Sequence, residues 1–485
     1  MYQTIFFDLD GTLTDSGPGI THSVAYALNK WNIKVEDYSV LNAFVGPPLA
    51  ESFAKYYNFT PEQCQKSIEY YREYYVEKGM FENSVYPGIR ELAAYLKDAG
   101  RKLVVATSKP EEFAVQIMEH FGLAQYFDRI AGASMDENRV EKARKQVADV
   151  IGAKSAEIFF TSGGTESDNW ALKGVMRANE KKGRHLIISA IEHHAILHSA
   201  KALEREGFDV TVLPVDADGV VSPEAVEAAI RPDTVLVSIM AANNEIGTIE
   251  PLEAIGEVCK RHGVVFHTDA VQAFGHIPLN VEQMHIDLLS VSAHKFHGPK
   301  GVGFLYIRKG VKLLPFMDGG AQEKNRRAGT SNVAGIVGMG EAAQQAMENM
   351  DATMAKVAAV RDHLISRIEA EIPHAKLNGH RTNRLPGNVN FCFRFIEGES
   401  MLMLLDAQGV CASSGSACTS GSLDPSHVLL AIGCPHEIAH GSLRLSLSEE
   451  TTMEDADFVV DQLKEIIPRL RSMSPLYADF IAENK

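Results

Sequence analysis

The chain has few cysteines, only two tryptophans and no long apolar run. Its 485 residues include six cysteines, too few for a disulfide framework in a chain of this length, which favours a reducing compartment. No apolar run reaches the roughly eighteen residues that cross a bilayer. The opening MYQTIFFDLDG places acids where a secretory signal has basic and then apolar residues. We therefore expect a cytoplasmic protein with no membrane partner.

Basic sequence is also scarce. The formal net charge is −16 and no lysine- and arginine-rich tract occurs, which argues against nucleic acid as a partner. The composition, 45% hydrophobic and 23% charged, is that of a globular protein. The length predicts two or three domains.

Strand and helix patterns alternate along the chain, which predicts an α/β fold with parallel sheets covered by helices on both faces. Two stretches differ from this pattern. Residues 16–83 are helical and aromatic and look like an insertion between the first two strands, and NRVEKARKQVADVIG predicts one continuous helix where two domains would meet. The buried-strand candidates are TIFFDLD, KLVVATS, EIFFTS, HLIISA, TVLVSIM, VVFHTDA and DLLSVSA.

A glycine-rich turn, TSGGTESDN at 161–169, lies between a strand and a helix. Small residues there let backbone N–H groups approach a phosphate, and the helix N-terminus favours an anion. Gly164 and Thr165 are the expected donors, although such a turn can also be a simple helix cap.

Two later strands end in residues that suit a pyridine-based cofactor. Asp269 ends VVFHTDA, where a carboxylate can keep a pyridine nitrogen protonated or merely cap a helix. Lys295 follows DLLSVSA, where burial would lower its pKa and free its amine as a nucleophile. Ser292 and His294 are placed to hold a phosphate; a metal site at His294 and His297 is the alternative, without further ligands of suitable spacing.

The last two motifs supply a thiol and a cation. GVCASSGSACTSGS places Cys418 among small residues, where it is exposed, whereas Cys259 and Cys392 lie in apolar stretches. Arg444 in GSLRLSLS could bind a carboxylate in a bidentate manner or lie on the surface.

Taken in order, TSGGTESDN, EHH, NNEIGT, DAVQ, SAHKFHGPKG, RRAGT, SSGSACTS and SLRLS resemble the cysteine desulfurases, pyridoxal 5'-phosphate (PLP) enzymes of the class-V aminotransferase type. The resemblance runs from about residue 140 to 485 and follows the long-loop branch. It implies a homodimer that converts L-cysteine to L-alanine with a persulfide on Cys418. The sulfur would then pass to an acceptor or scaffold protein for iron–sulfur cluster or thio-cofactor assembly.

The same resemblance implies a role for each site residue. Lys295 carries the cofactor and moves the substrate's α-proton, His193 stacks on the ring, and Arg444 binds the substrate carboxylate. Asp269 pairs with the ring nitrogen, and Thr330 reaches in from a second subunit. The remaining cofactor residues are Asn244 and Gln272 at the ring hydroxyl and Gly164, Thr165, Ser292 and His294 at the phosphate. The family's opening segment, with a Y-L-D-x-A-T-T-like strand and an Asn that assists substrate binding, is absent here.

The start of the chain, FFDLDGTLTDSGPG, resembles the haloacid-dehalogenase phosphatases of the phosphoglycolate-phosphatase type. That resemblance implies that Asp8 is a nucleophile and Asp10 a general acid/base, both at a Mg²⁺ ion, with Thr107 at the phosphoryl group. Lys142 could supply the family's lysine. The usual fourth motif, an acid pair, is replaced by GGTESD at 163–168, which keeps only Asp168 and belongs to the PLP motif. We therefore expect a truncated phosphatase.

The predicted architecture is a three-layer haloacid-dehalogenase-like core at 1–137 with a helical cap at about 16–83. A PLP fold-type I large domain at 138–350 and a small α+β domain at 351–485 follow. Two alternatives to desulfuration stay open. One is a Mg²⁺-dependent phosphatase acting on a small phosphate ester, and the other is an inactive fusion of two truncated domains.

Overall fold

The computed structural model describes residues 3–45, 49–133, 138–415 and 425–483. Its contacts divide the chain into two compact units, Met1–Arg139 and Val140–Lys485. The division falls inside α6 (Asn138–Val150), the helix that the sequence predicts across this stretch. Each unit has its own hydrophobic core, so each is described by itself.

The first unit is built on a three-stranded parallel sheet with the strand order β1-β4-β5. Helices α4 and α5 pack against it through β4, and α5 also contacts β5. The sheet and these two helices are β1 (Thr4–Phe7), β4 (Lys102–Pro110), β5 (Arg129–Ala133), α4 (Ile89–Asp98) and α5 (Glu111–His120).

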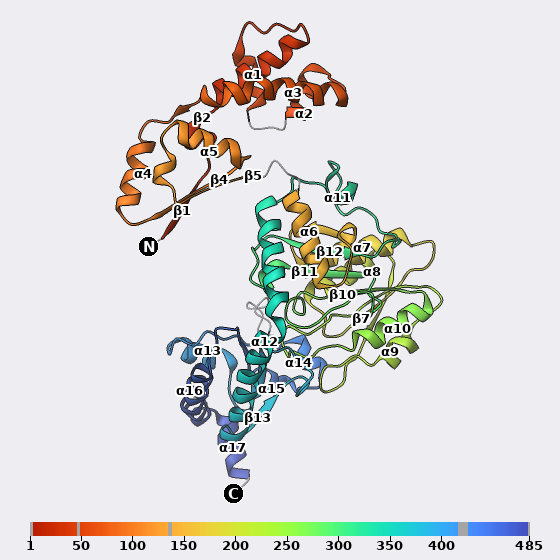
Figure 1. The fold of residues 1–485 in the computed structure, drawn as a ribbon. Coiled ribbons are helices and arrows are strands. Elements are labelled where there is room, and N and C mark those ends of the chain that lie inside the picture. Colours follow the sequence, from red (N-terminus) through yellow and green to blue (C-terminus); the bar gives the residue numbers. More distant parts are fainter. Residues whose placement is uncertain (1–2, 46–48, 134–137, 416–424, 484–485) are drawn as a thin grey trace. The chain divides into compact units, whose positions relative to one another are not determined.

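The chain between β1 and β4 is largely helical, as its pattern predicts (Figure 1). A capping box begins α3, in which the Thr60 hydroxyl accepts from the Gln63 N–H and the Gln63 side chain accepts from the Thr60 N–H. Helix α1 packs along α3, where the Trp31 indole N–H donates to Ser67. The elements are β2 (Thr14–Asp15), α1 (Gly17–Lys30), η1 (Tyr38–Phe44), α2 (Leu49–Tyr57), α3 (Pro61–Glu77), η2 (Gly79–Phe81) and β3 (Ser84–Val85), with η3 (Ala124–Tyr126) after α5.

Strand β1 is less buried than its apolar sequence predicts. Ile5 and Phe7 are partly buried against the core of this unit, whereas Phe6 between them is 68% exposed. The prediction of a buried strand is therefore wrong for one face of β1. The physical reason is that β1 ends the order β1-β4-β5 and that α4 and α5 pack on the face that carries Ile5 and Phe7.

The second unit begins with a seven-stranded sheet, ordered β6-β12-β11-β10-β9-β7-β8. Strand β12 is antiparallel to both neighbours, so the sheet is mixed rather than wholly parallel as predicted. The other neighbouring pairs are parallel. The strands are β6 (Ile158–Thr161), β7 (His185–Ser189), β8 (Asp209–Leu213), β9 (Thr234–Ser238), β10 (Val265–Asp269), β11 (Leu288–Ser292) and β12 (Gly303–Ile307).

Helices cover both faces of this sheet. One core joins it to α7 and α8 through side chains such as Trp170 and Leu203. The other joins it to α6, α10 and the start of α12 through Val147, Ile255 and Met339. The helices and 3-10 turns are η4 (Ser155–Glu157), α7 (Gly164–Ala178), α8 (His194–Arg205), α9 (Pro223–Ala229), α10 (Leu252–His262), η5 (Ala293–Lys295), α11 (Gln322–Asn325) and α12 (Val333–Glu371).

A smaller subdomain follows α12 within the same unit (Figure 1). Its antiparallel sheet, β13-β14-β15, packs against the second half of α12 and against α13 and α16. The elements are β13 (Ala375–Leu377), β14 (Asn388–Phe393), α13 (Gly398–Asp406), α14 (His427–Ala431), α15 (His436–Ala439), β15 (Ser442–Ser446), α16 (Met453–Ser472) and α17 (Pro475–Glu483).

The predicted α/β fold class is confirmed, with a mixed rather than parallel main sheet. Within the described parts of the chain, no helix is both long enough and apolar enough to cross a membrane.

Candidate functional site

A pocket of about 490 Å³ lies where β10 and β11 end, between the large sheet and the small subdomain. Side chains from both parts of the second unit line it. Ligands of α/β sheets bind at the carboxyl ends of strands, and this volume suits a cofactor. Among its lining residues are Gly164, Thr165, His193, Asn244, Asp269, Gln272, Ser292, His294, Lys295 and Arg444.

The N-terminus of α7 forms one wall of the pocket. Gly163 precedes the helix with φ of 148°, and no side chain caps it. A Cβ on Gly164 would lie 2.6 Å from Cγ2 of Val271, so only glycine fits this close approach. The uncapped backbone N–H groups and the helix dipole favour an anion at this wall.

Asp269 is buried at the end of β10. Its Oδ1 accepts from the Val271 N–H at 2.9 Å, and its side chain is 5% exposed. Burial raises its pKa to about 6, although the Val271 N–H and the positive charge of Lys295 oppose the shift. A buried carboxylate with this surrounding can accept from a protonated ring nitrogen.

His193 lies opposite Asp269 at the start of α8. Its Nδ1 accepts from the Ala195 N–H at 3.1 Å, which fixes the ring against the helix. The pKa of His193 is lowered by burial and then by the Lys295 charge. The imidazole is therefore neutral near pH 7, with its proton on Nε2 because Nδ1 is an acceptor.

Ser292, His294 and Lys295 follow one another at the end of β11. The Ser292 hydroxyl bonds to Nδ1 of His294 at 2.9 Å. Lys295 is exposed to solvent, so the expectation that it is buried is wrong. The reason is local: the chain leaves β11 through η5 at the pocket rim, so the apolar strand buries Val291 and Ala293 but not the lysine.

Arg444 enters from the small subdomain on β15, which pairs with β14 through Asn390. Its Nη1 donates to the Asn244 carbonyl at 3.3 Å, and its buried Nε has no hydrogen-bond partner among the described residues. An unsatisfied buried donor is costly. The guanidinium is thus placed to bind a carboxylate inside the pocket.

One predicted residue lies apart from this group, and another is not among the described residues. Thr330 is on an exposed segment and does not line the pocket. Cys418 falls outside the described residues. Of the five cysteines that are described, Cys259 and Cys392 are buried as expected, and Cys411 is exposed.

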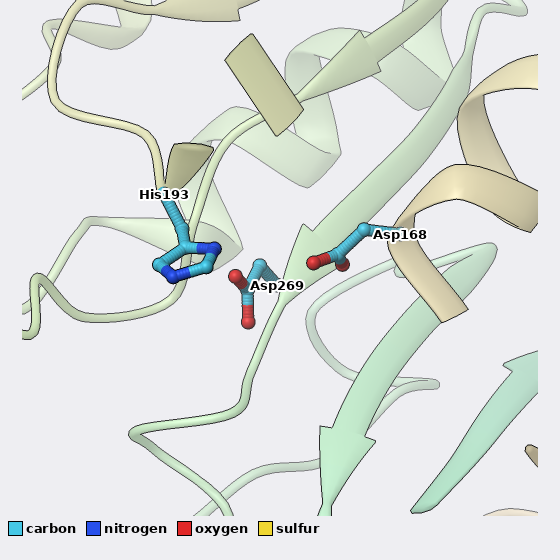
Figure 2. Close-up of side chains that lie close together, drawn as sticks. All are labelled: Asp168, His193 and Asp269. Atoms are coloured by element: carbon cyan, nitrogen blue, oxygen red, sulfur yellow. The ribbon is translucent and has the colours of Figure 1, made fainter. Parts of the chain in front are cut away.

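Asp168 is a pocket residue that the motif analysis did not assign to the cofactor. Figure 2 shows it on α7, facing Asp269 and His193. One side-chain ligand atom of each residue lies within 4.8 Å of the other two. Such a trio could hold a metal ion, but two of its members are residues that the resemblance assigns to PLP. The signal in the sequence was the helical spacing, because Asp168 lies one turn after Gly164.

The first unit gathers a second polar group at the ends of β1 and β4. Asp10 forms an ion pair with Lys109 at 3.1 Å, and the lysine amine also donates to Tyr75 of α3. Asp8 is exposed, and the Thr107 hydroxyl accepts from the Lys109 N–H. Lys109 was not predicted from the sequence, although it stands only two residues after Thr107.

The predicted lysine of this second group is not part of the first unit. Lys142 lies on α6 in the second unit and is exposed. No set of three His, Cys, Asp or Glu ligands in the described chain includes Asp8 or Asp10. A hard divalent cation binds through several oxygens, often including waters, so these two acids alone make a weak Mg²⁺ site.

The residues of the main pocket fit PLP in three respects. The N-terminus of α7 lines the pocket without a capping side chain, so its backbone N–H groups can take a phosphate. Asp269 is a buried carboxylate for the ring nitrogen, and Lys295 carries an amine on the same pocket. Arg444 then offers an unpaired donor to an amino-acid carboxylate.

Comparisons with known families assign both units. Residues 114–459 match the class-V aminotransferase family, and residues 5–139 match the haloacid dehalogenase-like hydrolases. The two matches overlap over 114–139. In that overlap α5 and β5 pack with the first unit, so the structure assigns most of it to the hydrolase-like part.

Known relatives cover the second unit in detail. A cysteine desulfurase IscS of Clostridium botulinum is 58% identical over 344 residues, 70% of this chain and 87% of the relative. One from Methanosarcina thermophila is 54% identical over 376 residues, 78% and 91% of the two chains.

Solved structures give the same result. A NifS-like protein is 41% identical with a TM-score of 0.64, covering 69% of this chain and 88% of its own. A structure described as SspA in complex with cysteine is 38% identical with a TM-score of 0.57, covering 65% and 88%. The chain therefore belongs to the cysteine desulfurase family of class-V aminotransferases and carries a haloacid dehalogenase-like unit at its start.

Proposed function

We propose that this chain is a PLP-dependent cysteine desulfurase that converts L-cysteine to L-alanine and leaves a persulfide on Cys418. The observation that carries the proposal is one pocket that combines Lys295, Asp269 and Arg444. The 58% identity to a cysteine desulfurase supports the same substrate. The sulfur would pass to an acceptor or scaffold protein for iron–sulfur cluster or thio-cofactor assembly.

In this proposal the pocket residues hold the cofactor from several sides. Lys295 would attach it covalently, Asp269 would accept from the ring nitrogen and His193 would support the ring. Asn244 and Gln272 would serve the ring hydroxyl. Gly164, Thr165, Ser292 and His294 would hold the phosphate. When bound, PLP supplies an electron sink for negative charge at the substrate's α-carbon.

The chain's own side chains then carry out the remaining steps. Arg444 binds the carboxylate of L-cysteine and orients its α-carbon toward Lys295. Lys295 moves the α-proton. The Cys418 thiolate attacks the substrate sulfur, the carbon–sulfur bond breaks, and alanine forms as its β-carbon takes up a proton.

A second copy of the chain would complete the site. Thr330 is exposed and outside the pocket, which suits a residue that serves a neighbouring subunit. The segment before it exposes Leu314 by 46%, Phe316 by 38% and Met317 by 41%. Apolar side chains gathered on one segment are typical of an interface. We therefore expect a homodimer, acting in a reducing cytoplasm.

For domain organisation we propose an incomplete hydrolase-like domain at 1–137 with its helical cap at about 16–83. The PLP-binding domain is at 138–350 and the Cys418 domain at 351–485. A second candidate function, Mg²⁺-dependent phosphate-ester hydrolysis at Asp8, Asp10 and Thr107, is favoured only by the match over 5–139. Its predicted lysine, Lys142, is in the other unit.

The test is release of alanine and sulfide from L-cysteine by the full chain, supplied with PLP and a thiol reductant. We expect Cys418→Ala to lose sulfide release while keeping the absorbance of the bound cofactor. Cys411→Ala removes the exposed thiol nearest in sequence and is the matched control, which should stay active. Full activity of Cys418→Ala would refute the assigned nucleophile, and a wild-type chain that binds PLP but releases neither product would refute the function.

A further inference from the structure

Asp168 is a buried acid that the proposed reaction does not use. It lies in the first turns of α7 with 1% of its surface exposed, and it faces the cofactor pocket. One of its oxygens lies within 4.8 Å of an oxygen of Asp269 and a ring nitrogen of His193 (Figure 2). Its Oδ1 has no hydrogen-bond partner among the described residues.

Among the described residues, no lysine or arginine forms an ion pair with Asp168. The nearest candidate is His267 on β10, whose Nε2 lies 3.8 Å from Asp168 Oδ1. Both nitrogens of that ring are already bonded to hydroxyls, Nδ1 to Ser238 at 2.8 Å and Nε2 to Ser290 at 2.9 Å. Burial lowers the pKa of His267 to about 3. It is therefore neutral at physiological pH.

The other charged and polar groups near Asp168 and Asp269 affect the two carboxyls differently. Glu192, before α8, is fully buried and adds a further acid, and burial raises its pKa to about 8. His193 is neutral, as described above. The positive charge of Lys295 and the Val271 N–H both act on Asp269. For Asp168 only the Ser290 hydroxyl opposes the shift, and its pKa is still raised well above its usual range, by burial and then by Asp269.

Two buried carboxylates this close cannot both be ionised without a nearby cation, so one of them keeps its proton. Asp269 has a backbone donor and a cation that favour its charged form, whereas Asp168 has the Ser290 hydroxyl but no cation among the described residues. The proton therefore resides on Asp168. A neutral carboxyl can donate a hydrogen bond, which an ionised one cannot.

We propose that Asp168 is a positioning residue, a protonated carboxyl that donates toward Asp269 and keeps it ionised and aimed at the cofactor's ring nitrogen. The inference rests on the proposed function, because Asp269 meets a ring nitrogen only if PLP binds here. Asp168 itself need not touch the cofactor. Its effect is carried by the ionisation of Asp269.

The test compares Asp168→Asn with Asp168→Ala in the full chain loaded with PLP. The amide keeps a donor without a charge, whereas alanine removes the donor. Glu250→Ala is the matched control, because Glu250 is 4% exposed, has one unpartnered oxygen and does not line the pocket. The measurements are the absorbance of the bound cofactor between pH 5 and 9 and the dissociation constant of PLP.

We expect the pH midpoint of cofactor loss in Asp168→Asn to lie within about 0.3 pH unit of the wild-type value. In Asp168→Ala the loss of a donor raises the pKa of Asp269, so the cofactor is lost at a pH about one unit higher and binds about tenfold more weakly. Glu250→Ala should lower thermal stability but leave the pH midpoint unchanged. A merely structural role for Asp168 would give Asp168→Ala the behaviour of this control.

Three results would overturn the inference. The first is an Asp168→Ala pH profile of cofactor absorbance that superimposes on that of the wild type. The second is a pH midpoint of Asp168→Asn that moves upward as far as that of Asp168→Ala. The third is a pH midpoint of Asp168→Asn that moves to lower pH. This third result would mean that Asp168 is ionised in the wild type. It tests the inference even if Asp168→Ala does not fold. A wild-type chain that never shows bound-cofactor absorbance would refute the proposed function as well, which separates the two failures.

Discussion

Both units of the chain place acids at the carboxyl ends of parallel strands, but the surroundings of those acids differ. In the second unit Asp269 is buried, accepts a hydrogen bond from a backbone N–H and lines one pocket together with Lys295 and Arg444. In the first unit Asp8 is exposed, and Asp10 forms an ion pair with Lys109.

The difference teaches that an acid at a strand end is a site only when other chain segments complete it. Helices α7 and α8 and strand β15 all contribute to the pocket around Asp269. The group around Asp10 draws on β1, β4 and α3, and no third metal-ligating side chain joins it among the described residues. Desulfuration is thus expected from the second unit, and hydrolysis is not expected from the first.

The strongest way to break this comparison is Lys295→Ala. We expect the absorbance of covalently bound cofactor to vanish and desulfuration to fall by at least about 10³-fold, because in the proposed function the lysine both attaches PLP and moves a proton. Spectroscopy and alanine release measure the two effects. Lys300→Ala, at another exposed lysine outside the pocket, is the control. Substantial activity in Lys295→Ala would mean that the pocket is not the site.

Arg444→Lys tests whether the small subdomain contributes to substrate binding. Lysine keeps the charge but loses the two-pronged geometry, so we expect KM for L-cysteine to rise about 10- to 100-fold with a smaller change in kcat. Steady-state kinetics separate these constants. An unchanged KM would remove Arg444 from the substrate site, while cofactor absorbance should stay as in the wild type.

Buried acids should also make the second unit pH-sensitive in the absence of cofactor. Burial raises the pKa of Glu192 and of Glu250 to about 8. The folded chain then holds protons that the unfolded chain has lost, so stability falls as pH rises from 4.5 toward 8. Below pH 6.5 histidines with lowered pKa, such as His267, act in the opposite direction.

The window from pH 6.5 to 8 therefore isolates the acids. We expect each glutamate to cost the folded state about 1–2 kcal/mol across it. Glu250→Gln keeps the oxygen that accepts from the Val221 N–H. Its free energy of unfolding should therefore fall less between pH 6.5 and 8 than that of the wild type, by about 1–2 kcal/mol. Chemical unfolding at several pH values measures the slope, and an equal slope in both proteins would contradict the assignment.

The smallest expected effect is that of Asp8→Asn. We expect desulfuration to be unchanged, because Asp8 belongs to the first unit and does not line the pocket. Hydrolysis of a small phosphate ester with Mg²⁺ should be at background in both proteins. Hydrolysis by the wild type that Asp8→Asn abolishes would show a working second site, and a loss of desulfuration would show that the first unit takes part in it.

Much of the pocket in the second unit could be predicted, because its residues stand in short motifs at the ends of strands. Gly164, Asp269 and Lys295 each follow a strand pattern, and the pocket brings them together. Asp168 was not assigned to it, because its helical spacing from Gly164 does not show that it faces the pocket until α7 is packed on the sheet. Lys109 was missed for a similar reason, since its partners Asp10 and Tyr75 are distant in sequence.

The sequence by itself determined the α/β class, the helix across the junction and the family of the second unit, because these depend on local periodicity and on motifs in fixed order. The tertiary structure alone decided that β12 runs antiparallel, that Phe6 is exposed and that Lys295 reaches solvent. It also decided that Asp168 lies buried near Asp269, with no lysine or arginine paired to it in the described parts of the chain. Burial and charge pairing depend on which distant segments pack together, and no local pattern encodes that.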